Sequence, residues 1–235
     1  MRNCLTCIIL SLFATGGLLA YTPGKWSPLD PYISGQVTRA PRELTVQDKQ
    51  GKVLQIARLE FSAGKLMKEH YVDGEGKPAG QTRYSYQNGL PVKEEQLSAK
   101  GEVLGEKTIT YEDGRPSLLQ VKEGGQIIQE ISFKYSKGLL MEAREKSGST
   151  EDIHSYVYKN DRLAAIHTRD EAGQEFHRIE YVYDAQGRLS ERKRFSGELK
   201  QTCKVEYNNG DLISYAYYDL QKNEWVLQKK LSFRF

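Results

Sequence analysis

The chain has 235 residues, of which 38% are hydrophobic and 28% are charged, a composition typical of a folded protein and not of a disordered one. Its 34 basic and 31 acidic side chains nearly balance, which argues against the strongly basic surface of a nucleic-acid-binding protein. At about 100–200 residues per domain, the length allows one or two domains. The 15 tyrosines favour β-structure.

The first twenty residues have the features of a secretory signal peptide. Arg2 precedes an apolar run from Cys4 to Ala20 that only Thr and Ser interrupt, and a polar stretch follows. We expect cleavage after Ala20, so that residues 1–20 are removed. The alternative is an uncleaved membrane anchor, because the 17 apolar-run residues approach the lower limit for a spanning helix. Cleavage would leave Cys203 as the one remaining thiol, which excludes an intramolecular disulfide and a cysteine-based metal site.

The next segment, residues 21–42, holds four of the seven prolines and shows neither a helical nor an alternating period. This pattern predicts an extended linker or a segment that covers the edge of a sheet. We expect its aromatic residues Trp26 and Tyr32 to pack on the first strands of the domain that follows.

From residue 43 to residue 235 the chain repeats one short pattern. An aromatic residue, two or three polar residues and usually a glycine recur every 23–26 residues. The pairs Asn88-Gly89 and Asp113-Gly114 favour type I′ turns, in which both central residues have positive φ. A period of this length predicts a repeat architecture. The aromatic positions are Phe61, Tyr86, Tyr111, Tyr135, Tyr158, Tyr183, Tyr207 and Phe233.

The turns also predict which residue lies opposite each aromatic residue in its hairpin. The pairs are Phe61 with Leu66, Tyr86 with Pro91, Tyr111 with Pro116, Tyr135 with Leu140, Tyr158 with Leu163, Tyr183 with Leu189 and Tyr207 with Leu212. The preceding strands alternate, so that Ile131, Phe133 and Tyr135 share one face. We predict an all-β protein: an antiparallel meander of about seven hairpin repeats and about fifteen strands. A sheet of this size is expected to form a strongly curved sheet, a half-barrel or a closed barrel.

The stretch YVYDAQGRLSERKRF at 181–195, with YNNGDL and YEDGRP, resembles the YD repeat of the RHS family. MORN-like repeats of exported bacterial proteins are similar. The resemblance spans roughly residues 45–235, and the copy at 183–189 matches closely. It implies a repeat architecture and a bacterial exported protein, and it brings no catalytic residues. Long arrays of this family enclose a toxin domain, but seven units are too few for such a shell and no toxin domain follows.

Motifs for catalysis are missing from the sequence, which has no HExxH, GxSxG or phosphate-binding loop. We therefore expect no catalytic residues, no cofactor and no metal. The pattern could bring His154 and His167 onto adjacent strands, but no carboxylate or cysteine framework accompanies them. Cys203 shares the apolar phase of Val205 and Tyr207, which favours a thiol in the core over a nucleophile.

Two surface hypotheses compete with plain structural explanations. The tyrosine rows could line a groove that stacks on sugar rings or a peptide, although their phase also matches burial in a core. The basic stretch from Arg188 to Lys204 could meet an acidic polymer or a membrane, but Glu191 and Glu198 interrupt it and favour a solvated strand face. The groove candidates are Tyr84, Tyr156, Tyr181, Tyr215 and Tyr217.

These observations predict an exported, non-enzymatic β-repeat protein of the bacterial envelope or periplasm that binds a protein or glycan, or serves as a scaffold, with no nucleic-acid partner. The alternative is an outer-membrane β-barrel, because the final residues LSFRF place Leu231, Phe233 and Phe235 on one face. Membrane-spanning strands need about 9–11 residues with an unbroken lipid face, whereas the apolar phase here lasts about three alternations. An enzyme is the third hypothesis.

Overall fold

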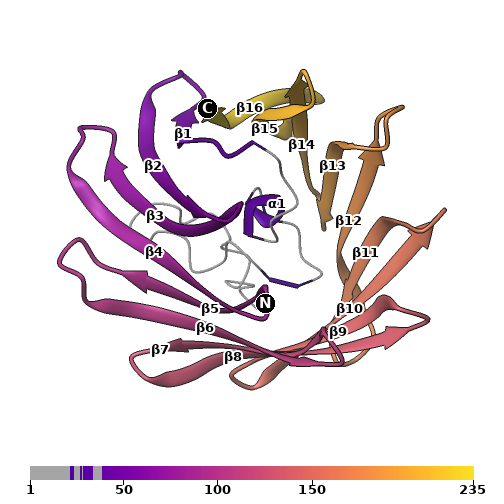
Figure 1. Ribbon diagram of the computed structural model, residues 1–235. Coiled ribbons are helices and arrows are strands. Elements are labelled where there is room, and N and C mark those ends of the chain that lie inside the picture. The colour runs from indigo at the N-terminus through magenta and orange to yellow at the C-terminus, as the bar shows by residue number, and fades with distance from the viewer. Residues whose placement is uncertain (1–21, 24–26, 28, 34–38) are drawn as a thin grey trace.

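A computed structural model describes residues 22, 23, 27, 29–33 and 39–235, in which sixteen strands form a closed barrel (Figure 1). Consecutive strands pair antiparallel, and β1 pairs with β16 to close the sheet. This confirms the predicted meander and selects the closed barrel among the three expected shapes. Closure leaves no open sheet edge.

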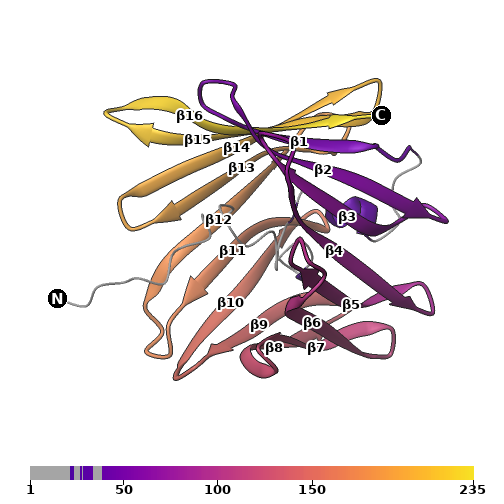
Figure 2. The same cartoon turned by 90° about the vertical axis from the view of Figure 1, so that its left-hand side faces the viewer.

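The strands tilt across the barrel wall, as the side view shows (Figure 2). Their bounds are β1 (Glu43–Asp48), β2 (Val53–Ser62), β3 (Lys65–Asp73), β4 (Pro78–Gln87), β5 (Leu90–Leu97), β6 (Val103–Glu112), β7 (Arg115–Glu123), β8 (Gln126–Ser136), β9 (Leu139–Ser147), β10 (Thr150–Lys159), β11 (Arg162–Arg169), β12 (Glu175–Tyr183), β13 (Leu189–Ser196), β14 (Leu199–Asn208), β15 (Asp211–Gln221) and β16 (Glu224–Arg234). A barrel of sixteen strands is wide enough to enclose more than its own wall side chains.

The predicted turns are present. Asn88 and Gly89 both have positive φ, at 50° and 80°, as a type I′ turn requires. In the longer turn after Tyr183, Gly187 takes the positive φ, at 79°. The residues of all seven predicted aromatic pairs lie opposite one another, and a one-residue register shift, a β-bulge, comes directly before each aromatic residue.

Tyrosine phenols tie five of the hairpins to the one before. The phenol of Tyr183 donates a hydrogen bond to the carbonyl of Leu163, at 2.9 Å. Equivalent bonds run from Tyr86 to Leu66, Tyr111 to Pro91, Tyr158 to Leu140 and Tyr207 to Leu189. Each accepting carbonyl lies beside a bulge. The backbone hydrogen bonds between the strands are irregular there, so the backbone groups need other hydrogen-bond partners. The repeated tyrosine thus has a structural role, which explains why the pattern recurs.

Alternation along the strands places one set of side chains inside the barrel and the other outside. The inner set forms two apolar clusters, which we name by their position. The helix-side wall comprises Leu44, Val46, Ala57, Leu59, Leu66, Tyr71, Tyr84, Cys203, Val205, Leu212, Tyr215, Leu231 and Phe233. The far wall comprises Ile109, Leu119, Val121, Ile131, Phe133, Leu140, Ala143, Tyr156, Ile166 and Tyr181.

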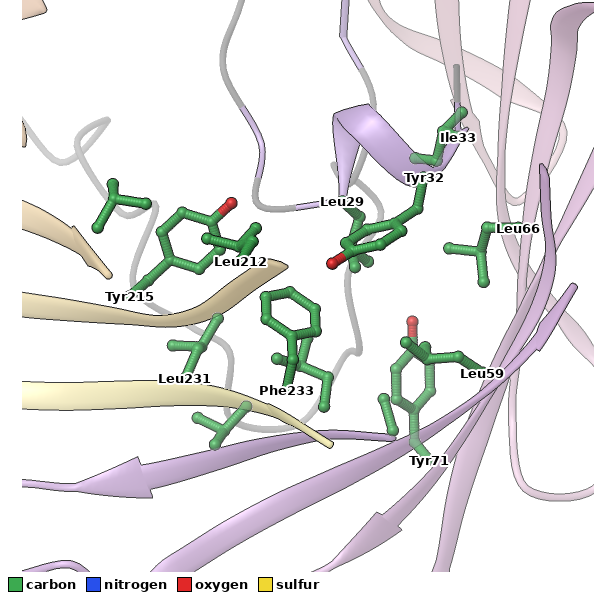
Figure 3. Packing of buried hydrophobic residues seen from close by; sticks show 14 of the residues in the cluster. Leu29, Tyr32, Ile33, Leu59, Leu66, Tyr71, Leu212, Tyr215, Leu231 and Phe233 are labelled. Carbon is green, nitrogen blue, oxygen red and sulfur yellow. The ribbon is translucent and has the colours of Figure 1, made fainter. Parts of the chain in front are cut away.

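Of the segment predicted as an extended linker or edge cover, residues 29–33 lie inside the barrel. Residues Asp30–Ile33 form one helical turn, α1, that packs against the helix-side wall (Figures 1 and 3). The expectation for Tyr32 is confirmed, because its ring lies edge-on to Phe61 of β2 at 6.0 Å. Among the described residues, no helix is long and apolar enough to cross a membrane. The predicted signal peptide and Trp26 lie outside the described residues.

Candidate functional site

The five tyrosines of the groove hypothesis all point into the barrel, but they are divided between its two walls. Tyr84, Tyr215 and Tyr217 lie on the helix-side wall or pack against it, and Tyr156 and Tyr181 belong to the far wall. All but Tyr217 are at least nine-tenths buried. They therefore contribute to the core of the barrel and do not form one row.

The phenol groups on the two walls differ in their partners. On the helix-side wall, the Tyr84 phenol donates to a Glu69 carboxylate oxygen at 2.5 Å, and the Tyr71 phenol lies 2.8 Å from the Thr82 hydroxyl. On the far wall, the phenols of Tyr156 and Tyr181 are buried and have no hydrogen-bond partner among the described residues. A buried polar group without a partner carries a free-energy cost. Burial raises the pKa of both phenols, so each remains a hydrogen-bond donor at neutral pH.

A cluster of buried charges lies between the walls, on β3, β5 and β6. Lys107 and Glu94 form an ion pair at 3.0 Å, and their side chains are only 1% and 3% exposed. Glu69 is buried nearby, and its pKa is raised to about 7, first by desolvation and then by the charge of Glu94. Sequence reasoning missed this cluster. The signal was available, because Lys107 shares the inward phase of Ile109 and Tyr111.

Two hydrogen-bonded groups of polar side chains lie end to end across the inner faces of β8 to β15, with the first on β8 to β11 and the second on β12 to β15. His154 lies 2.9 Å from Glu145 and 3.0 Å from Thr168. Farther along, Arg194 donates to His177 at 2.9 Å. We call this set the polar belt; it comprises Gln129, Glu145, His154, Thr168, His177, Arg194, Gln201 and Asp219.

The belt settles the two hypotheses that concerned histidines and basic residues. His154 and His167 do lie on adjacent strands, but His154 faces the lumen whereas His167 faces outward and bonds Glu175 at 2.9 Å. The two rings therefore cannot share a metal ion. Within the described ranges, no group of three or more His, Cys, Asp or Glu could hold a metal ion.

The basic stretch is divided between the two sides of the wall in the same way. Arg192 lies opposite the inward-facing Tyr181 and Cys203, and Arg194 belongs to the polar belt. Lys193, between them, points outward and lies 3.5 Å from Glu191. The prediction of a single solvated strand face was therefore wrong for both arginines, because alternation sends every second residue inward.

Ion pairs cover much of the outer surface of the barrel. Lys134 of β8 pairs with Glu142 of β9 at 3.0 Å, and Arg144 of β9 pairs with Glu151 of β10 at 2.8 Å. Similar outward pairs lie between β2 and β3, between β5 and β6, between β14 and β16 and between β1 and β16. Ion-paired charges thus face outward around the circumference, with single exposed apolar residues such as Val157 and Val182 between them, while the two apolar clusters and the polar belt face the lumen.

No family model matches the chain, and no curated protein matches it. Solved structures share the fold. A porin-like protein from Bacteroides uniformis has a TM-score of 0.52 at 12% identity, over 82% of this chain and 95% of its own. A porin-like protein from Bacteroides vulgatus has a TM-score of 0.50 at 11% identity, over 84% of this chain and 99% of its own. At these identities the likeness concerns the barrel fold alone.

Proposed function

We propose that this chain is an exported, non-enzymatic binding protein of the bacterial envelope, whose barrel works in water and takes its partner in the lumen. One observation carries the proposal: charged side chains, many of them in ion pairs, occupy outward positions around the barrel among single exposed apolar residues such as Val157 and Val182, whereas the two apolar clusters lie inside. The resemblance of the N-terminus to a signal peptide supports export. The enclosed, tyrosine-rich lumen supports binding.

The outer surface argues against contact with lipid. A membrane barrel carries an outward apolar band about 25 Å tall, and a Lys or Arg at its midplane costs about 2–4 kcal/mol. Here β9 places Glu142, Arg144 and Lys146 at successive outward positions in the register. Several such charges within one strand would be costly in a lipid-facing band and support a water-facing surface.

An outer-membrane barrel is the second candidate, and the fold shared with two porin-like proteins favours it. The sequence argument for it was the aromatic end of the chain. Phe233, however, is buried in the lumen, where its ring lies 5.4 Å from that of Tyr32. Phe235 also packs on the helix-side wall. The terminal aromatic residues therefore support the core and not a lipid-facing belt.

Cell fractionation tests these two candidates. We expect the mature protein to appear in the soluble exported fraction, and any membrane-associated part to be released by carbonate without detergent. A known outer-membrane barrel and a known periplasmic protein from the same cells serve as controls. Retention in the outer membrane, with migration on a gel that changes on heating, would contradict the proposal and support the membrane barrel.

A further inference from the structure

The described part of the N-terminal segment occupies the helix-side wall through side-chain contacts. The Tyr32 ring is 1% exposed and lies between Phe61 of β2 and Phe233 of β16 (Figure 3). Leu29 and Ile33 are buried in the same cluster. An aromatic anchor seated between rings of the partner surface is the usual centre of a binding interface.

Residues 29–33 belong to none of the sixteen barrel strands, whereas Thr22 forms an isolated bridge and Arg42 makes backbone hydrogen bonds to β2 and β16. All sixteen strands find both neighbours within residues 43–234. Within the segment, the amides of Tyr32 and Ile33 donate to the carbonyl of Leu29, and the amide of Ser27 donates to the Asp30 carboxylate at 2.7 Å. The segment is therefore a short folded peptide inside a barrel whose strands are all paired without it.

One charged group gives this contact chemical selectivity. The Asp30 carboxyl is buried among Lys107, Arg192 and Glu94, and its pKa is raised well above the ordinary value because burial disfavours the charged form. The two cations attract an acid at this position. Burial of this carboxyl costs desolvation free energy, which lowers the affinity of the wall for the segment.

We propose that the helix-side wall is a peptide-binding site and that residues 29–33 are its intramolecular occupant. The site takes a short segment with an acidic residue two positions before an aromatic one, as Asp30 stands before Tyr32. A partner peptide of the same chemistry binds by replacing this segment. This inference rests on the proposed binding function and names the ligand class for it.

Peptide exchange tests the proposal. A recognition sequence for a site-specific protease is inserted between Gly35 and Gln36 of the chain that begins at residue 21, and the folded protein is cleaved. A fluorescent peptide of residues 21–35 is then added in excess and followed by anisotropy. We expect it to enter the barrel and to be displaced by the unlabelled peptide. A peptide with Tyr32→Ala, which lacks the aromatic anchor, should compete at least about tenfold more weakly.

Cys203 provides a second readout without added labels. Its thiol is 2% exposed and belongs to the same cluster as Leu29 and Tyr32. After cleavage and removal of the segment, the thiol should react with a chromogenic thiol reagent, and added peptide 21–35 should protect it. The Cys203→Ser variant is the matched control for background reaction.

Two outcomes would overturn the inference. In one, circular dichroism shows that the strands unfold whenever the segment leaves, so that it is part of the core. In the other, the cleaved segment never exchanges with labelled peptide. Neither result would by itself contradict the proposed function. A barrel that is extracted without detergent but does not exchange peptide remains a water-facing protein without this site.

Discussion

The two walls of the lumen are built from the same repeat but are completed in different ways. On the helix-side wall, the N-terminal segment covers the apolar cluster, and the phenols of Tyr71 and Tyr84 have polar partners. On the far wall, the phenols of Tyr156 and Tyr181 are buried and find no partner in the part of the chain that the structure describes. The repeat determines the strands and hairpins of the barrel. The polar residues at inward positions, which depart from its apolar pattern, determine which groups each wall can bind.

The largest expected effect concerns the buried ion pair between the walls. Lys107→Met leaves the Glu94 carboxylate without its partner in a buried position, and we expect the free energy of unfolding to fall by about 3–5 kcal/mol. Urea denaturation followed by far-UV circular dichroism measures it. The double variant with Glu94→Met removes both charges and should recover most of the loss. A double variant as unstable as the single one would show that packing, not charge, sets the effect.

The next effect is a pH dependence from Glu69. Because burial raises its folded-state pKa from 4.5 to about 7, the folded state holds the proton more tightly than the unfolded state. Its contribution to stability is therefore complete below pH 4.5 and is lost as the pH rises through 7. We expect Glu69→Gln to remove this loss and to stabilise the barrel at pH 8 by about 2–3 kcal/mol.

Glu60→Gln is the control for this experiment. Glu60 is outward and solvent-exposed, and its hydrogen bond with His70 lowers its pKa. Its small contribution is present at neutral pH and is lost as the pH falls, the opposite sign from Glu69. Denaturant midpoints measured from pH 4 to pH 8 separate the two. Parallel pH profiles for the two variants would contradict the assignment.

A pair of phenylalanine variants compares the walls directly. Tyr84→Phe removes the donor to Glu69 and should lower the free energy of unfolding by about 1–3 kcal/mol. Tyr156→Phe removes a hydroxyl that has no partner, so we expect no loss or a small gain. Thermal unfolding of both variants beside the unmodified protein tests this. Equal losses would show that the Tyr156 phenol is bonded in solution.

The hairpin frame could be predicted from the sequence because its determinants are local. Asn-Gly and Asp-Gly turns, and related pairs such as Lys137-Gly138 and Asn160-Asp161, set the register of the hairpins, and alternation then sets which residues face inward. Pairing of β1 with β16 could not be predicted in this way, because it joins residues 191 positions apart, such as Glu43 and Arg234. Closure depends on the tilt and stagger accumulated over all the strands.

The candidate site could be predicted in part. The inward direction of the five tyrosines follows from their phase, but their division between two walls depends on the curvature of the sheet. Glu94 and Lys107 look like surface residues by type, and only their phase indicates that they pair inside. The position of α1 could not be predicted, because residues 21–42 have no period and their place depends on the width of the lumen.

The smallest effect tests the tyrosine bonds that join the hairpins. The Tyr207 phenol donates to the Leu189 carbonyl at 3.1 Å, on the helix-side wall. Tyr207→Phe should lower the free energy of unfolding by about 0.5–1.5 kcal/mol, the usual net value of one hydrogen bond. Tyr135 holds the same place in its hairpin beside the far wall, but among the described residues its phenol makes no such bond. Tyr135→Phe should therefore have almost no effect in urea denaturation. If both variants lose the same stability, the phenol bond is not what distinguishes these repeats, and the aromatic ring alone accounts for the recurring tyrosine.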